Sequence, residues 1–327
     1  MRIAQTLGIY STILFFVPFS CMKETPGRTC RPSPQLGDSL TIEQSCIAIS
    51  RNLIAVLGAD DTAALSAFYH VLDSTGAGLA LSLGNREETP AAVDSILSIV
   101  YRNWAIGFDN RDMSLDALLP HLVHKNRNGA CLGVSLIILM LAEKVKCPVY
   151  GVMLPGHFFC RYENSATRIN IEPNKSGINH PDGYYKDHYP LATRSWYDLR
   201  NLTKRETVGM LCYNAGAICL DRGKFDPAIF YCRQAMRRLN DLPEAKGNCA
   251  LAYAQKGALD SSLVLFKELF SLHPDFVNCA ANYGTILMEA GKTMEAQEVY
   301  KKGLEYFPED TVLKKGIEET RRTLTAP

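Results

Sequence analysis

A repeat spacing of 34 residues near the C-terminal end is the feature that most restricts how this chain folds. Gly223, Gly257 and Gly291 recur at that spacing. Small residues recur at the same spacing on both sides of these glycines. Before them stand Gly216, Ala250 and Gly284, and after them stand Ala228, Ser262 and Ala296. A period of this length predicts stacked helical hairpins, with small side chains where two helices cross closely.

The repeats resemble the tetratricopeptide (TPR) family, whose unit is a helical hairpin of this length. We place three copies at about 209–242, 243–276 and 277–310, followed by a capping helix at 310–324. One hairpin cannot bury its apolar stripe alone, so the copies must stack. The resemblance implies an all-α solenoid whose groove docks a protein or peptide partner. The alternative is an array that only packs against the preceding domain.

The predicted capping helix should have one charged face, because a terminal helix turns that face to water. Six charged residues fall on it: Lys314, Lys315, Glu318, Glu319, Arg321 and Arg322.

The N-terminal residues differ from the rest of the chain. An apolar run at 9–19 is too short for a comfortable membrane span and is typical of a secretion signal, here placed at 1–20. Cys21 follows directly, an order that resembles the lipobox of bacterial lipoproteins; an ordinary signal peptide with an incidental cysteine is the alternative. Residues 21–38 are rich in proline and poor in apolar side chains, so we expect a flexible tether. The sequence thus predicts an exported, envelope-associated protein that is either lipid-anchored or secreted.

The charge balance argues against nucleic-acid binding, and the spacing of the cysteines argues against a zinc site. Lys and Arg number 35 against 34 Asp and Glu, a net charge of +1 that provides no basic stripe for nucleic acid. The cysteines number 11, and none has the spacing of zinc ligands. Five of them fall within amphipathic helical segments, where we expect buried free thiols: Cys212, Cys219, Cys232, Cys249 and Cys279.

Residues 39–202 form a separate domain of mixed pattern. Segments with apolar positions at helical spacing come first, and short apolar or alternating segments follow: 41–57, 61–74 and 90–104, then 148–153, 157–162 and 168–172. Helices followed by strands indicate an α+β domain.

Three residues of this domain have the chemistry of a nucleophilic site. Cys131 begins an apolar helix predicted at about 132–146, where unsatisfied N–H groups and the helix dipole favour the thiolate. His157 opens a strand after a tight turn, and Glu172 ends the next strand. If those strands are antiparallel, Glu172 can reach the imidazole and fix its tautomer. A nucleophile, a base and an orienting acid are then available.

At these residues the chain resembles the transglutaminase-like group of the papain-type cysteine fold, in the bacterial branch where that domain precedes TPR repeats. The match is carried by Asn-Gly-Ala-Cys-Leu-Gly, Pro-Gly-His-Phe and Asn-Ile-Glu-Pro, within about 118–189. The resemblance implies that Cys131 is the nucleophile, His157 the general base and Glu172 the third member. The superfamily's usual acid at the last position is the shorter Asp.

The implied reaction is acyl chemistry on peptide-like amides through a thioester, with no metal or organic cofactor. The backbone N–H of Cys131 is one candidate oxyanion donor, and Asn126 or Asn128 is a second. The segment 174–189 is expected to be a loop that borders the cleft. The alternative is a non-enzymatic scaffold at the cell envelope, in which Cys131 and His157 are packed structural residues.

Overall fold

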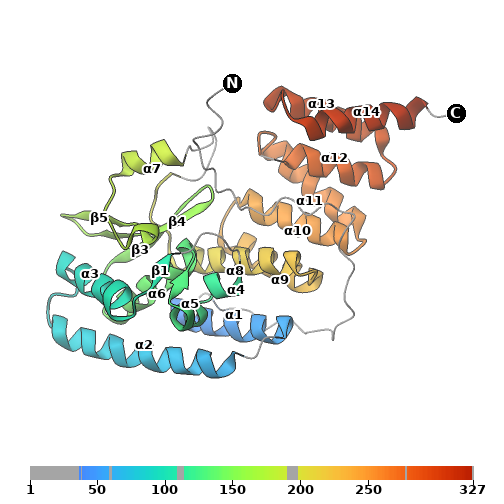
Figure 1. Ribbon diagram of the computed structural model, residues 1–327. Helices are drawn as coiled ribbons and strands as arrows, with labels where there is room; N and C mark the ends of the chain where they lie inside the picture. Colours follow the sequence, from blue (N-terminus) through green and yellow to red (C-terminus); the bar gives the residue numbers. More distant parts are fainter. Residues whose placement is uncertain are drawn as a thin grey trace. The chain divides into compact units, whose positions relative to one another are not determined.

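The computed structural model describes residues 37, 39–58, 61–108, 114–189, 198–276 and 278–325. The chain divides into two compact units, and the division falls between Leu211 and Cys212, inside helix α8 (Lys204–Asp221). Figure 1 labels the elements of both units. The predicted signal segment, Cys21 and nearly all of the predicted tether lie outside the described residues.

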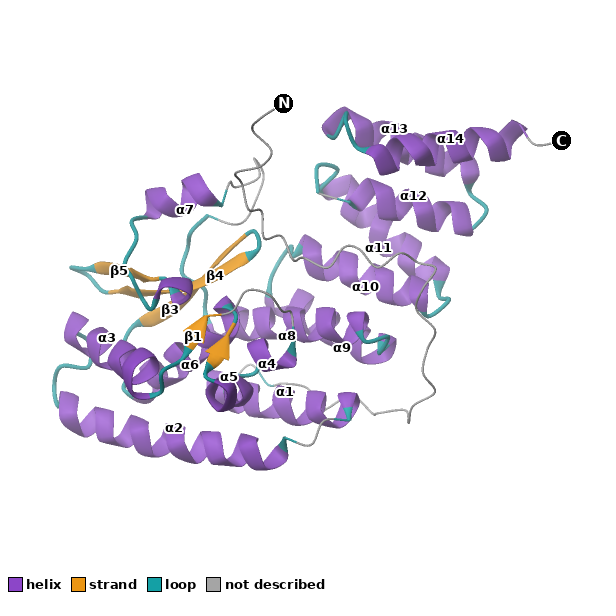
Figure 2. Cartoon of the chain, in the orientation of Figure 1, coloured by secondary structure: helices purple, strands orange, loops and turns teal. Residues whose placement is uncertain are grey.

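Helices dominate the first part of the first unit (Figure 2). They are α1 (Ile42–Leu57), α2 (Thr62–Leu83), α3 (Pro90–Leu97), a π-helical turn η1 (Ser98–Asn103), α4 (Leu115–Leu118), α5 (Pro120–Asn126) and α6 (Cys131–Lys144). The central helix α6 is buried from Leu132 to Ala142, which explains its uniformly apolar sequence.

Helix α2 continues well beyond the predicted end at Ser74. Its buried stripe runs on through Gly76 and Leu79 to Leu83. A Cβ at Gly76 would lie only 2.4 Å from the Lys144 side chain, so the glycine is the place where α6 approaches α2 most closely. Packing between the helices therefore outweighs the low helix propensity of glycine.

The strands form an antiparallel sheet in the order β3 (Val149–Leu154), β4 (His157–Glu163) and β5 (Arg168–Ile171). The last two strands pair antiparallel, with Cys160 opposite Ile171, which meets the condition under which Glu172 was expected to reach His157. A short parallel pair, β1 (Gly107–Phe108) and β2 (Asn128–Gly129), was not predicted. Helix α6 packs against β3 and β4, which confirms the α+β architecture.

The segment 174–189 is not the continuous loop that the sequence indicated. It contains a 3-10 turn, η2 (Pro173–Lys175), and helix α7 (Asp182–His188). Pro181 occupies the N-cap and Asp182 the first turn, where a carboxylate favours a helix start. The wholly buried Tyr185 holds the helix against the sheet.

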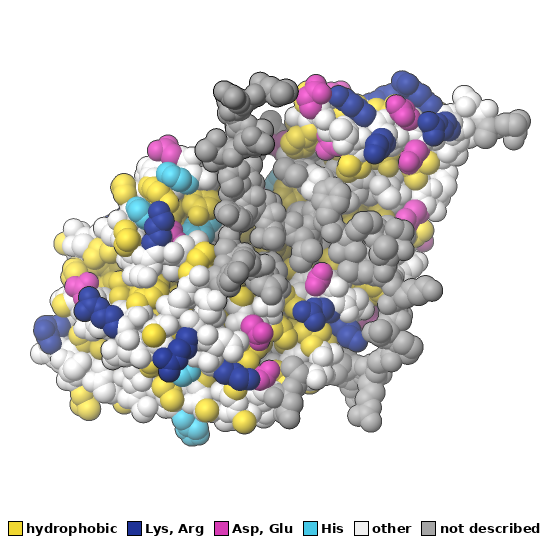
Figure 3. All heavy atoms as spheres, viewed as in Figure 1, with side chains coloured by type: hydrophobic (Ala, Val, Ile, Leu, Met, Phe, Trp, Pro, Cys, Tyr) yellow, Lys and Arg dark blue, Asp and Glu magenta, His cyan; other side chains and the backbone are white. Residues whose placement is uncertain are grey.

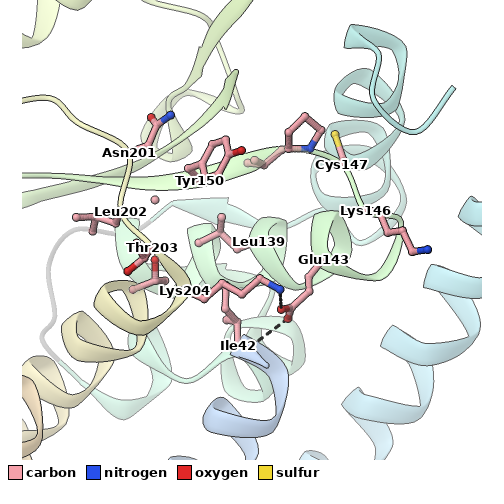
Figure 4. A pocket seen from close by; sticks show the side chains of 14 residues that line it. Ile42, Leu139, Glu143, Lys146, Cys147, Tyr150, Asn201, Leu202, Thr203 and Lys204 are labelled. Carbon is pink, nitrogen blue, oxygen red and sulfur yellow. Dashed lines mark hydrogen bonds and ion pairs between the residues drawn. The ribbon is translucent and has the colours of Figure 1, made fainter. Parts of the chain in front are cut away.

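Glu143, near the end of α6, contacts the first residues of helices α1 and α8. Its carboxylate accepts a hydrogen bond from the Ile42 N–H at 3.1 Å and pairs with the Lys204 ammonium at 2.6 Å (Figure 4). These residues border a cavity of about 470 Å³ that also contacts the start of β3. Cys131, His157 and Glu172 do not line this cavity.

The second unit is helical and contains the predicted hairpins. After α8 come α9 (Phe225–Arg238), α10 (Pro243–Gln255), α11 (Leu259–Leu272), α12 (Cys279–Glu289), α13 (Thr293–Tyr306) and α14 (Thr311–Thr325). The three repeated glycines have φ angles of 64°, 83° and 73°, the left-handed region that glycine tolerates best: Gly223, Gly257 and Gly291. An all-α repeat region follows the α+β domain, as predicted.

Small residues stand where the two helices of a hairpin cross. A Cβ at Gly284 would lie 2.3 Å from the Tyr300 ring, and one at Gly316 would lie 2.6 Å from the other edge of that ring. A Cβ at Gly216 would lie 2.7 Å from the Cys232 sulfur. The 34-residue pattern of small residues therefore reflects close helix contact.

The last helix α14 has the predicted amphipathic character. Leu313 and Ile317 are buried, whereas all six charged residues assigned to its outer face are exposed. Figure 3 shows positive and negative side chains interspersed over this end of the repeats. The five cysteines predicted to be buried free thiols are buried and form no disulfide. Among the helices in the described ranges, none has the length and apolar content needed to cross a membrane.

Candidate active site

Cys131 is the first residue of α6, as predicted, and its side chain is half-buried. Two glycines allow this helix start to pack tightly. A Cβ at Gly129 would lie 2.7 Å from Val123, and one at Gly133 would lie 2.2 Å from the Ala117 carbonyl oxygen. The Ala130 N–H donates to that same carbonyl at 2.9 Å. The thiol is therefore held at the positive end of a buried helix.

His157 and Glu172 face each other across the β4–β5 edge and are almost fully buried, at 5% and 2% exposure. The imidazole Nε2 lies 2.9 Å from Glu172 Oε2. The other carboxylate oxygen, Oε1, accepts the backbone N–H of Asn174 at 3.0 Å. The longer glutamate side chain thus reaches the imidazole, as predicted.

The Cys131 side chain is the other polar group that acts on the His157 ring, and together with Glu172 it raises the pKa of the imidazole. Because Glu172 engages Nε2, Nδ1 is the nitrogen that remains for the thiol. The structure brings all three predicted residues together in the order thiol, imidazole, carboxylate. Their catalytic roles stay a prediction.

The electrostatics of the site favour a protonated His157 and an ionised Glu172, although both side chains are buried. Burial lowers the pKa of His157, but hydrogen bonds to Cys131 and Glu172 and their charges outweigh it and raise the pKa to about 9. Burial raises the pKa of Glu172, and the hydrogen bond and charge of His157 outweigh it, so the net shift is downward. The histidine and the glutamate therefore stabilise each other as an ion pair.

Aromatic rings that the sequence analysis did not single out complete the site. The Tyr189 ring stacks on the His157 imidazole, with centroids 4.5 Å apart and planes at 8°. Next to it, Tyr185 stacks on Phe159 at 4.0 Å and 9°. The signal available in the sequence was the spacing of Asp182 and Tyr185, which places both on one side of a helix, whereas Tyr189 follows the end of that helix.

The candidates for a second oxyanion donor lie just before the nucleophile. Asn126 is the last residue of α5, and Asn128 pairs with Gly107 in the small parallel sheet. That assignment stays a prediction. Among the described residues, no cluster of three or more His, Cys, Asp or Glu side chains is arranged to hold a metal ion.

Comparison with known proteins places this site in a family. Residues 66–181 match the family model of the Transglutaminase-like superfamily. These residues form a transglutaminase-like domain. The matched range includes Cys131, His157 and Glu172, and it ends one residue before α7.

A second comparison concerns the repeats. The chain is 34% identical over 79 residues to small glutamine-rich tetratricopeptide repeat-containing protein 2 of Mycosarcoma maydis, a stretch that covers 24% of this chain. The chain spans 22% of the length of that relative. TPR repeats therefore follow the transglutaminase-like domain.

Two solved structures are also similar. The Sgt2 TPR domain of Aspergillus fumigatus covers 36% of this chain, and the match includes 78% of that domain, with 21% identity and a TM-score of 0.34. A crystal structure of menin, described with its binding site for Mixed Lineage Leukemia (MLL) protein, covers 82% of this chain, and the match includes 66% of menin, with 14% identity and a TM-score of 0.47.

Proposed function

We propose that Cys131, His157 and Glu172 carry out acyl chemistry on peptide-like amides by a thioester route. The observation that supports this most strongly is the buried His157 imidazole, which is hydrogen-bonded to Glu172 and whose pKa the neighbouring Cys131 side chain helps to raise. A buried imidazole between a thiol and a carboxylate is the arrangement that activates a cysteine nucleophile. The match of this region to the transglutaminase-like superfamily agrees with the proposal.

In the first half-reaction, the Cys131 sulfur attacks the carbonyl carbon of the amide and forms a C–S bond. The backbone N–H of Cys131 stabilises the oxyanion. The proton held by His157 passes to the leaving nitrogen as the C–N bond breaks, which releases an amine and leaves a thioester. Water or a second amine then attacks the thioester carbon and gives its proton to His157, and the C–S bond breaks, which releases the acid or the new amide and restores the Cys131 thiolate. Glu172 stays ionised throughout and keeps the imidazole oriented.

The test is the rate at which iodoacetamide alkylates Cys131 in the full chain near neutral pH, measured by peptide mass spectrometry. We expect Cys131 to react faster than a free small-molecule thiol and to slow in His157→Ala. The matched control is His70→Ala, because His70 is exposed on α2. A wild-type rate no faster than that of the free thiol would favour the scaffold alternative.

We also propose that the repeats dock a protein or peptide partner. Peptides selected from a displayed library by the full chain should lose binding when Gly284→Leu forces α12 and α13 apart. They should keep binding in Gly78→Leu, because a Cβ at Gly78 meets nothing within 4 Å. Equal binding to both variants would place the peptide elsewhere.

Export and lipidation at Cys21 form a separate proposal, supported by the N-terminal sequence pattern. Mass spectrometry of the native protein should find a mature chain that begins at Cys21 and carries lipid, and Cys21→Ser should release it from membranes. A mature chain that begins at Cys21 without lipid would support secretion alone. A soluble protein that still begins at Met1 would contradict export.

A further inference from the structure

Helix α7 and Tyr189, the residue that follows it, contact alternate residues of strand β4. Figure 1 shows α7 beside the strands of the sheet. Asp182 and Tyr185 share one side of the helix, because residues three apart lie above one another, and Tyr189 directly follows the last helical residue, His188. Positions 161, 159 and 157 share one side of the strand, because side chains alternate. The contacts in order are an ion pair and two ring stacks: Asp182 with Arg161, Tyr185 with Phe159, and Tyr189 with His157.

The ionic contact is built around a buried guanidinium. Arg161 is 1% exposed, and its Nε donates to Asn170 Oδ1 at 2.7 Å. One terminal nitrogen donates to Asp182 Oδ1 at 2.8 Å, and the other donates to the Leu199 carbonyl. Asp182 also accepts from the Arg168 guanidinium at 3.0 Å. A fixed, fully paired fork of this kind sets where α7 begins relative to β4.

Tyr189, directly after the C-terminal end of α7, meets His157. Glu172 holds one edge of the imidazole through Nε2, but an edge contact leaves the ring free to tilt about that bond. The Tyr189 ring lies flat against the face of the imidazole and blocks this tilt. The groups around the imidazole come from several elements: Cys131 of α6, Glu172 after β5, Tyr185 of α7, Tyr189 directly after α7, and Tyr101 of η1 beside Glu172.

We propose that α7 is the positioning element of His157, with the Arg161–Asp182 pair fixing its register and Tyr189 holding the imidazole plane toward Cys131. This inference rests on the proposed function, and it adds residues that act through His157. A tyrosine face against the ring also stabilises the imidazolium form by cation–π attraction. Without the ring the imidazolium is free to turn away from Cys131 and should stabilise the thiolate less, so less thiolate should be present at mildly acid pH.

The experiment compares the pH dependence of Cys131 alkylation in the full chain. In Tyr189→Leu we expect the acid limb of the profile to move to higher pH, with about three- to tenfold slower alkylation near pH 6. Tyr189→Phe keeps the ring and should restore the wild-type profile. Asp182→Ala should shift the profile in the same direction as Tyr189→Leu, because α7 loses its ionic register.

The matched control is Tyr184→Leu, on the same helix. The Tyr184 ring stacks between His180 and His188, at 3.9 and 4.0 Å, and not on His157. A Tyr189→Leu profile identical to the wild type would overturn the inference, as would an equal shift in Tyr184→Leu. A wild-type thiol with ordinary reactivity would overturn the proposed function and this inference together. A reactive wild type that is indifferent to Tyr189→Leu would overturn this inference alone.

Discussion

The His157 imidazole and the Glu172 carboxylate form a buried pair, with 2.9 Å between Nε2 and Oε2. Both side chains are nearly withdrawn from water, so each charged form depends on the other for stabilisation. The same pair therefore affects the stability of the domain as well as the chemistry of the site.

The stabilisation from this pair should depend on pH. The raised pKa of His157 contributes stability that is complete below about 6.5 and is lost as the pH rises through about 9. The lowered pKa of Glu172 contributes stability that is present above 4.5 and is lost at more acid pH. Glu172→Gln should therefore destabilise most between those limits, by about 3 kcal/mol. Urea unfolding of both proteins across this range measures the difference. A difference that grows toward pH 9 would contradict the assignment.

His121 should produce the opposite pH dependence. The residue is fully buried in α5, and neither ring nitrogen has a hydrogen-bond partner among the described residues. Burial lowers the pKa of His121 from 6.5 to about 4, so the unfolded chain binds a proton in that interval and the folded chain does not. We expect the free energy of unfolding to fall by on the order of 2 kcal/mol as the pH is lowered from 6.5 to about 4. In His121→Leu the free energy of unfolding should depend less steeply on pH in this interval. An unchanged pH dependence would contradict the assignment of this effect to His121.

A matched pair of glycine substitutions tests the close helix packing in the repeats. Gly284→Ala places a methyl group 2.3 Å from the Tyr300 ring, and Gly316 packs against the other side of that ring, which leaves it no room to move. We expect a loss of about 2 kcal/mol. Gly78→Ala in α2 meets nothing within 4 Å and should gain about 0.5 to 1 kcal/mol. Thermal unfolding followed by circular dichroism measures both, and a destabilised Gly78→Ala would argue against this account.

Local patterns in the sequence predicted much of the fold and the site. The repeat period located the hairpins because each copy carries its own turn glycine and small contact residues. The start of α6 at Cys131 and the order of β4 and β5 followed from periodicity and turn residues. The contact of Glu172 with His157 was expected only if these two strands pair antiparallel, and they do.

The elements that the sequence did not predict depend on distant contacts. Helix α7 has only seven residues, one of them Gly183, and it is held by Arg161 and by the stack of Tyr185 on Phe159. Short helices of this kind have little stability of their own. The stacking of Tyr189 on His157 could not be predicted either, because it requires the register between α7 and β4.

The most direct test of the central claim is whether Cys131 accepts an acyl group. The full chain would be incubated with an activated phenyl ester and analysed by intact-protein and peptide mass spectrometry. We predict one acyl group on Cys131 that hydroxylamine removes, as expected for a thioester, and that His157→Ala greatly reduces. No acyl group on Cys131, or equal acylation in His157→Ala, would contradict the account.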